Sequence, residues 1–186
     1  RTEWEKFGLN GARKLLYVGR VSREKGLDTL MDAFQQVRAT RESVELVIVG
    51  DGPYKEQLEL LAAGDRKVIF AGYQHGEDLA KLYASSDVFV FPSATDTFGN
   101  VVLEAQASGV PVVVVSRGGP AEQVKSGVNG LVVDPDEPAQ MADAIASLLD
   151  DALLRTRMGK AGRRRALALS LKRAAQAQWD LYEAVW

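Results

Sequence analysis

Cysteine is absent from the 186 residues, and histidine occurs once, as His75. These two scarcities exclude a disulfide framework, a metal site with cysteine ligands and a metal site with several histidines. The longest apolar run, around Val112–Val115, is far shorter than the roughly 20 residues of a membrane-spanning helix. Excess positive charge is also lacking, since the formal net charge is -2. No overall basic field therefore indicates nucleic acid or an anionic membrane as the partner.

What the chain does have is apolar residues arranged in short runs. It is 46% hydrophobic and 26% charged, a composition typical of globular domains. The runs predict strands at Leu15–Gly19, Val44–Val49, Val68–Phe70, Val88–Phe91, Pro111–Val115 and Leu131–Val133. Because these runs are nearly continuously apolar, helices should cover both faces of the sheet. Their alternation with helical patterns predicts an α/β fold, a doubly wound parallel six-stranded sheet with right-handed crossovers.

Helices are expected between these strands and after them. The clearest carries apolar side chains at the spacing of one helical face, at Leu27, Leu30, Met31, Phe34 and Val37. Others are predicted at Tyr54–Ala63, Glu77–Ser85, Asn100–Ser108, Ala121–Lys125 and Pro138–Leu149, and two C-terminal helices at Leu153–Leu169 and Leu171–Trp186. We expect residues 1–12 to be a polar, loosely structured lead-in and residues 13–186 to form one domain.

Two cations lie in the loop after the first predicted strand, in "GRVSREKGLDTL" (residues 19–30). Arg20 and Lys25 come just before a helix, where backbone N–H groups, the helix dipole and formal charge together favour an anion. Both side chains suit phosphate. Taken alone, such a pair is more often two solvated surface charges in a turn, so the loop leaves both interpretations open.

Two carboxylates, Asp96 and Glu104, are separated by seven residues in "FPSATDTFGNVVLEAQASG". A helix that begins near Asn100 leaves its first N–H groups without partners inside the helix. Glu104 lies one turn further on, and helical side chains lean toward the N-terminus. We therefore expect both carboxylates to face the same space, where they would suit a polyhydroxyl ligand with an anionic group.

A structural interpretation of the same stretch is equally open. Asp96, Thr95 or Thr97 can cap the helix, and Glu104 can be a surface acid favoured by the helix dipole. Two glycine-containing loops leave a similar choice. Gly50–Leu58 more often marks a structural turn, whereas the loop at residues 118–120 favours a flexible segment that faces a ligand.

A basic cluster near the C-terminus has two interpretations as well. Its residues are Lys160, Arg163, Arg164, Arg165, Lys172 and Arg173. Such a run is more often a solvated helical face, and the alternative is docking on acidic lipid or on another domain.

The order of the motifs reveals a resemblance. "YVGRVSREKGLDTLMDAF", "LVIVGDGPYKEQLE", "VIFAGYQHGEDLAKLYASSDVFVFPS", "TDTFGNVVLEAQASGVPVV" and "GGPAEQVKSGVNGLVVDP" follow one another at characteristic intervals. Over about residues 12–150 the chain resembles the C-terminal, donor-binding half of a glycosyltransferase of family 4 (group 1), with the GT-B fold. The set is highly specific, although each motif alone is weak.

The resemblance implies a Rossmann-like domain of a retaining hexosyltransferase that uses UDP-sugar or GDP-sugar and requires no metal or other cofactor. Arg20 and Lys25 match the pair that binds the diphosphate, Asp96 the residue that meets the donor sugar, and Glu104 the residue that binds the ribose. The backbone of Gly19 and residues 98–101 matches the segments around phosphate and sugar. That second segment consists of Phe98, Gly99, Asn100 and Val101, and Tyr73 and Gln74 fall near the base.

The chain departs from the family pattern in two ways. The first acid of the motif is most often Glu, whereas here it is Asp96, which is one methylene shorter. In addition, an N-terminal acceptor domain is missing, and the chain begins at Arg1, so we expect a fragment that is inactive alone. We also expect a cytoplasmic enzyme, possible peripheral membrane or lipid-acceptor contact through the missing half, and no nucleic-acid partner. The alternative is a non-catalytic nucleotide-binding or regulatory module.

Overall fold

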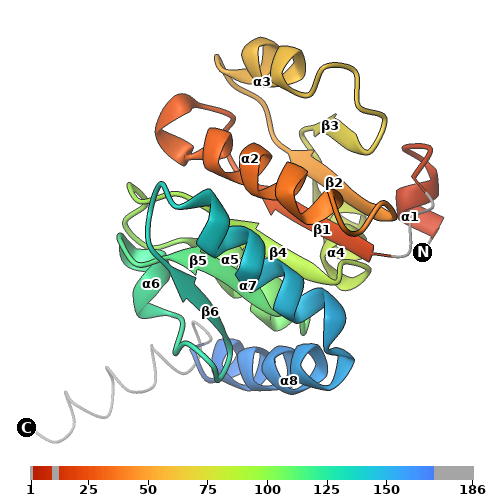
Figure 1. Cartoon of the computed structure of the whole chain (residues 1–186). Coiled ribbons are helices and arrows are strands. Elements are labelled where there is room, and N and C mark those ends of the chain that lie inside the picture. The colour runs from red at the N-terminus through yellow and green to blue at the C-terminus, as the bar shows by residue number, and fades with distance from the viewer. Residues whose placement is uncertain (1, 10–12, 170–186) are drawn as a thin grey trace, which may run out of the picture.

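The computed structural model describes residues 2–9 and 13–169, which are built around one parallel sheet (Figure 1). Its strands are β1 (Arg13–Val18), β2 (Val44–Val49), β3 (Val68–Gly72), β4 (Val88–Phe91), β5 (Val112–Val115) and β6 (Gly130–Val133). Their order across the sheet is β3-β2-β1-β4-β5-β6, and every neighbouring pair is parallel. The predicted doubly wound α/β fold is confirmed. The strand order reverses between β1 and β4, which is where sheets of this kind leave a crevice at their carboxyl edge.

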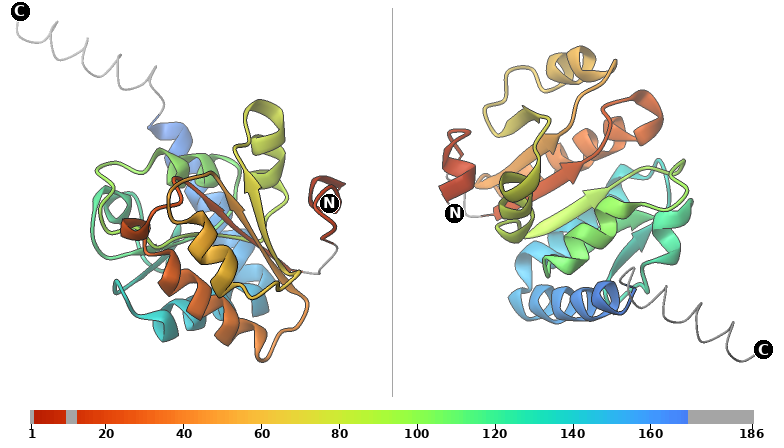
Figure 2. Two further views of the ribbon diagram at one scale, coloured as in Figure 1. Left: turned by 90° about the horizontal axis from the view of Figure 1, so that it is seen from above. Right: turned by 180° about the vertical axis from the view of Figure 1, so that it is seen from behind.

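Helices cover both faces of the sheet (Figures 1 and 2). They are α1 (Thr2–Glu5), α2 (Leu27–Arg38), α3 (Lys55–Leu61), α4 (Gly76–Ala84), α5 (Asn100–Ala107), α6 (Gly119–Glu122), α7 (Pro138–Asp150) and α8 (Ala152–Ala168), with a 3-10 turn, η1 (Arg23–Lys25). α2 and α7 pack together on one face, and α4 and α5 lie on the other. α8 lies against α5 at the outer edge. No helix of residues 2–9 and 13–169 is long and apolar enough to cross a bilayer.

The predominantly apolar runs form the strands, and the strands are buried at the centre of the fold. Every residue of β2, β4 and β5 is buried, and β2 and β4 have the predicted bounds. The remaining predicted strands and helices differ from the observed ones by one to three residues at their ends. The helix predicted at Leu171–Trp186 lies outside the described residues.

The expectation of a loose lead-in is wrong for residues 2–9. Trp4 is fully buried, and its Nε1 donates a hydrogen bond of 2.7 Å to Ser85 Oγ at the end of α4. Leu9 is also buried. Trp4, Phe7 and Leu9 are too few to define a periodicity in this short stretch, and the burial of Trp4 and Leu9 becomes visible only once α1 lies beside α4.

Candidate functional site

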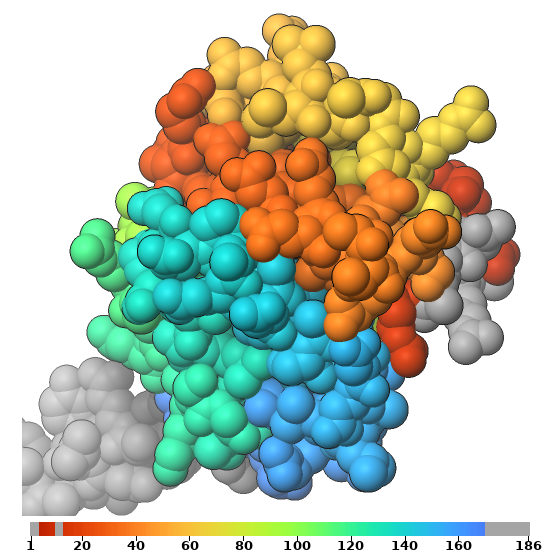
Figure 3. Space-filling model, viewed as in Figure 1, coloured from red at the N-terminus to blue at the C-terminus, as the bar shows by residue number. Residues whose placement is uncertain are grey.

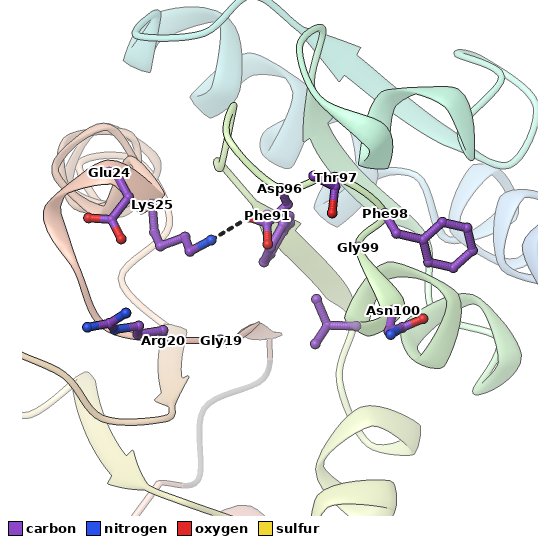
Figure 4. Close-up of a pocket in the computed structure, with 11 residues that line it drawn as sticks. Gly19, Arg20, Glu24, Lys25, Phe91, Asp96, Thr97, Phe98, Gly99 and Asn100 are labelled. Carbon is purple, nitrogen blue, oxygen red and sulfur yellow. Dashed lines mark hydrogen bonds and ion pairs between the residues drawn. The ribbon is translucent and has the colours of Figure 1, made fainter.

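A cavity of about 410 Å³ opens where the strand order reverses, between the loop after β1 and the loop from β4 to α5 (Figure 4). Eight of its lining residues are those that the sequence predicts: Gly19, Arg20, Lys25, Asp96, Phe98, Gly99, Asn100 and Val101. Glu24, Phe91 and Thr97 also line it and were missed. We call it the charged cavity, because it brings together Arg20, Glu24, Lys25 and Asp96.

Lys25 reaches across the charged cavity to Asp96. Its Nζ lies 2.8 Å from Asp96 Oδ2, and the two side chains are only 16% and 25% exposed. The turn formed by η1 and Gly26 positions Lys25 beside Asp96. Gly26 has φ 68°, and a Cβ there would lie 2.7 Å from the carbonyl oxygen of Pro92. Only glycine therefore allows this close passage, which sets the loop after β1 beside the loop after β4.

Of the other two charged residues of this cavity, Glu24 has a side-chain partner in its own loop, whereas Arg20 is held through its backbone. Arg20 is exposed, and its carbonyl oxygen accepts a 3.0 Å hydrogen bond from the Tyr17 hydroxyl. Burial, chiefly, raises the pKa of Tyr17 above its usual range, so the phenol keeps its proton and remains a donor. The Ser22 hydroxyl donates to Glu24 Oε1 at 2.6 Å and holds the pKa of that carboxyl below its usual value. Glu24 is therefore ionised beside Arg20 and Lys25.

The N-terminus of α5 forms the opposite wall. Its N-cap is Gly99, with φ 77°, and no side chain caps the helix. The alternative that Asp96, Thr95 or Thr97 is the cap is thus wrong, because the left-handed backbone at Gly99 starts the helix instead. In Figure 4 the Phe98 ring points away from Lys25, so it does not fill the space in front of the ammonium group. The N–H groups of the first helical turn have no intrahelical partners and suit an anion.

A brace from α6 holds the Asp96 loop from behind. The Gly119 N–H donates to the Asp96 carbonyl oxygen at 2.8 Å, and a Cβ on Gly119 would lie 1.9 Å from the carbonyl oxygen of Thr97. Nε2 of the buried Gln123 donates to the carbonyl oxygen of Phe98. The glycines predicted to form a flexible, ligand-facing loop are therefore explained by close backbone packing. Gln123 was missed, since its sequence neighbourhood gives no signal.

Glu104 does not share the charged cavity, which corrects the expectation that both acids face one space. It lines a neighbouring cavity of about 330 Å³, whose other residues are Gly76, Leu79, Ala80, Tyr83, Ala107 and Ser108. We call this the Glu104 cavity. The Tyr83 hydroxyl donates to Glu104 Oε2 at 3.0 Å. Burial first, and then Glu104, raise the pKa of Tyr83 above its usual range, so Tyr83 remains the donor.

Tyr73 and Gln74, predicted near the base, line neither of these cavities. Tyr73 is 67% exposed and its ring stacks on that of His75, with 6.2 Å between the centroids. Gln74 donates from Nε2 to the carbonyl oxygen of Ala71 at 2.8 Å and lines a smaller third cavity beside Lys6. Among the described residues, no cluster of three His, Cys, Asp or Glu side chains could hold a metal ion.

Comparison with known proteins identifies the family. The model of the family described as glycosyl transferases group 1 matches residues 2–165. The chain belongs to this family. Among similar proteins, an uncharacterized glycosyltransferase of Methanocaldococcus jannaschii is 42% identical over 142 residues, which are 75% of this chain and 36% of that protein. A GDP-mannose-dependent alpha-mannosyltransferase of Corynebacterium glutamicum is 39% identical over 154 residues, which are 82% of this chain and 35% of that protein.

A solved structure shows the same relation in three dimensions. Anabaena HepE, crystallised with UDP and glucose, superposes with a TM-score of 0.82 at 25% identity, over 97% of this chain and 51% of that one. The chain thus spans about a third of the length of these curated relatives and about half of this structural neighbour. Its Rossmann-like fold is that of one half of a GT-B glycosyltransferase.

Proposed function

We propose that this chain is the donor-binding, C-terminal half of a retaining family 4 hexosyltransferase that uses a UDP-sugar or GDP-sugar and no metal ion. The observation that carries the proposal is the charged cavity, which is lined by Arg20, Lys25 and the N-terminus of α5 and in which Lys25 pairs with Asp96. The similar proteins support a nucleotide-sugar donor, since one depends on GDP-mannose and another was crystallised with UDP and glucose.

In this proposal the diphosphate displaces the ion pair between Lys25 and Asp96. Its oxygens take the Lys25 ammonium and the Arg20 guanidinium, and the backbone of residues 98–101 adds N–H donors. Asp96, released from Lys25, then accepts hydrogen bonds from hydroxyls of the donor sugar. As the bond from sugar to phosphate breaks, the two cations stabilise the charge that develops on the leaving diphosphate.

The nucleoside belongs in the Glu104 cavity under the same proposal. One carboxylate oxygen of Glu104 already accepts from Tyr83, and the other remains to accept from a ribose hydroxyl. Tyr73 and Gln74 would meet the base at the rim. In this proposal the acceptor site lies in the other half of the intact enzyme. Lipid is one candidate for the acceptor. The 186 residues alone would bind the nucleotide without transferring sugar. We propose that the intact protein is cytoplasmic.

Titration of the chain with UDP, GDP and NAD by isothermal calorimetry tests this function. We expect one of the two nucleoside diphosphates to bind more tightly than NAD. Preference for NAD, or no binding of any of the three, would contradict the proposal. Binding of UDP or GDP with no transfer by the intact enzyme would favour a regulatory module instead.

A further inference from the structure

One helix concentrates positive charge on a surface that the donor site does not use. α8 contains six of the 23 basic residues of the chain and none of its 25 acidic ones. It lies at the outer edge of the molecule, beside α5 and α7 (Figures 1 and 3). None of its residues lines the charged cavity or the Glu104 cavity. The donor site therefore gives no reason for this charge.

Two of the six cations have structural tasks. Arg155 donates to the carbonyl oxygens of Leu148 and Leu149 at the end of α7, and its Nε lies 3.7 Å from Asp87. Arg165 donates to the carbonyl oxygen of Glu122 at 3.1 Å. The other four are exposed and form no hydrogen bond or ion pair with any residue of the described ranges: Arg157, Lys160, Arg163 and Arg164.

Three of these cations lie on one straight stripe of α8 with a leucine at each end. The stripe runs through Leu153, Arg157, Lys160, Arg164 and Leu167, at i, i+4, i+7, i+11 and i+14. Leu153 is 84% exposed and Leu167 is 59% exposed, although large apolar side chains are usually covered. At 1.5 Å of rise per residue the stripe is about 21 Å long. We call it the α8 stripe.

The opposite side of α8 is anchored in the fold, which sets the orientation of the stripe. Gly159 lies so close to the backbone of Gly109 that a Cβ would be 2.0 Å from its carbonyl oxygen. Met158 and Gly162 are buried, and a Cβ on Gly162 would lie 3.1 Å from Gln106 Cγ. Packing this close keeps the α8 stripe directed away from α5.

The charge pattern does not stabilise the helix itself. Like charges three and four residues apart, as at Arg157, Lys160 and Arg164, repel one another and weaken an isolated helix. No acidic residue of α8 offsets the repulsion. Among the described residues no acidic side chain pairs with these three cations, so they are available to negative charge on another molecule.

We propose that the α8 stripe docks on the surface of an anionic lipid membrane. Lys and Arg on one face of a helix are attracted to acidic headgroups, while flanking leucines insert among the acyl chains. The leucines favour lipid over nucleic acid, because a phosphate backbone provides no apolar environment for a leucine side chain. A membrane contacts only the α8 face, and charges elsewhere on the chain are screened by salt. The formal net charge of -2 on the whole chain therefore does not oppose the contact. This proposal does not depend on the donor site.

Vesicle flotation of the 186-residue chain tests the contact. One set of vesicles consists of phosphatidylcholine and the other of equal parts phosphatidylcholine and phosphatidylglycerol. We expect binding only to the second set, weakening as salt is raised. The triple variant R157Q/K160Q/R164Q should bind these vesicles about a hundredfold more weakly, at about fivefold for each cation removed. The variant L153S/L167S should also bind more weakly, because it removes the apolar part.

Two controls separate lipid from other partners. The triple variant K55Q/R66Q/K81Q removes the same charge from other surfaces and should bind the vesicles almost as the unmodified chain does. R157K/R164K keeps the charge and should retain binding, because headgroups read charge rather than the geometry of the guanidinium. Circular dichroism verifies folding of each variant. The proposal is overturned by absence of vesicle binding, by equal losses in both triple variants, by loss in the lysine variant, or by binding of RNA in place of vesicles.

Discussion

The two neighbouring cavities differ in the kind of surface that they present. The charged cavity holds Arg20, Glu24, Lys25 and Asp96, with Lys25 and Asp96 joined at 2.8 Å. The Glu104 cavity has one charged side chain, Glu104, among mostly small or apolar neighbours. α5 joins them, because its first turn lines the first cavity and Glu104, one turn later, lines the second. Under the proposed function, this difference assigns the phosphates to the charged cavity and the nucleoside to the Glu104 cavity.

The largest effect is expected from breaking the brace behind the charged cavity. Gly119→Ala places a Cβ 1.9 Å from the Thr97 carbonyl oxygen and forces the Asp96 loop to move. We expect a loss of up to about 3 kcal/mol in the free energy of unfolding, measured by urea denaturation, together with weaker nucleotide binding. Gly64→Ala is the control, since it meets nothing within 4 Å and only its φ of 72° is strained. Unchanged stability and affinity in the Gly119 variant would exclude the brace.

Lys25→Ala should have the next largest effect, on binding. Removing a cation from a phosphate contact lowers the affinity for UDP or GDP by about a hundredfold, as hydrogen bonds to charged groups are worth about 1.5–3 kcal/mol. Calorimetry measures the change. Lys55→Ala, on α3 and outside both cavities, removes the same charge and should bind as the unmodified chain does. Equal affinities of the two variants would count against a phosphate at Lys25.

Glu104→Gln should weaken nucleotide binding by about tenfold, because a neutral amide accepts hydrogen bonds from hydroxyls less strongly than a carboxylate does. The matched control is Glu56→Gln, which is exposed on α3. If the Glu104 variant lost thermal stability and kept its affinity, the carboxylate would have only a structural role with Tyr83.

The smallest effect concerns the orientation of Glu104. Tyr83→Phe keeps the ring and removes the 3.0 Å hydrogen bond to Glu104, so affinity should fall by about threefold to tenfold. Tyr54→Phe removes a comparable bond, to Asp28 Oδ1 at 2.6 Å, outside both cavities. In a chain that already carries Glu104→Gln, the Tyr83 variant should cost less. Full additivity of the two changes would show that Tyr83 does not act through Glu104.

Much of the fold follows from the sequence because short runs dominated by apolar, β-branched residues, such as Val44–Val49, favour buried strands. The charged cavity was predictable for a related reason. Arg20 and Asp96 each follow a parallel strand, and the carboxyl ends of such strands meet at one edge. The direction of Glu104 was not predictable, because it depends on how α4 lies against α5 and on where Tyr83 then points. Trp4 and Gln123 were missed because each is defined only by contacts distant in sequence.

The most direct test of the two cavities compares, between variants, the preference for diphosphate over monophosphate and the preference for ribose over dideoxyribose. The affinities for UDP, UMP and 2′,3′-dideoxy-UDP, or for the guanine series if GDP binds better, are measured for the unmodified chain, Lys25→Ala and Glu104→Gln. We predict that Lys25→Ala abolishes the preference for diphosphate over monophosphate and keeps the preference for the ribose hydroxyls. Glu104→Gln should do the reverse. If both variants reduced both preferences equally, the assignment of phosphate to one cavity and ribose to the other would be contradicted.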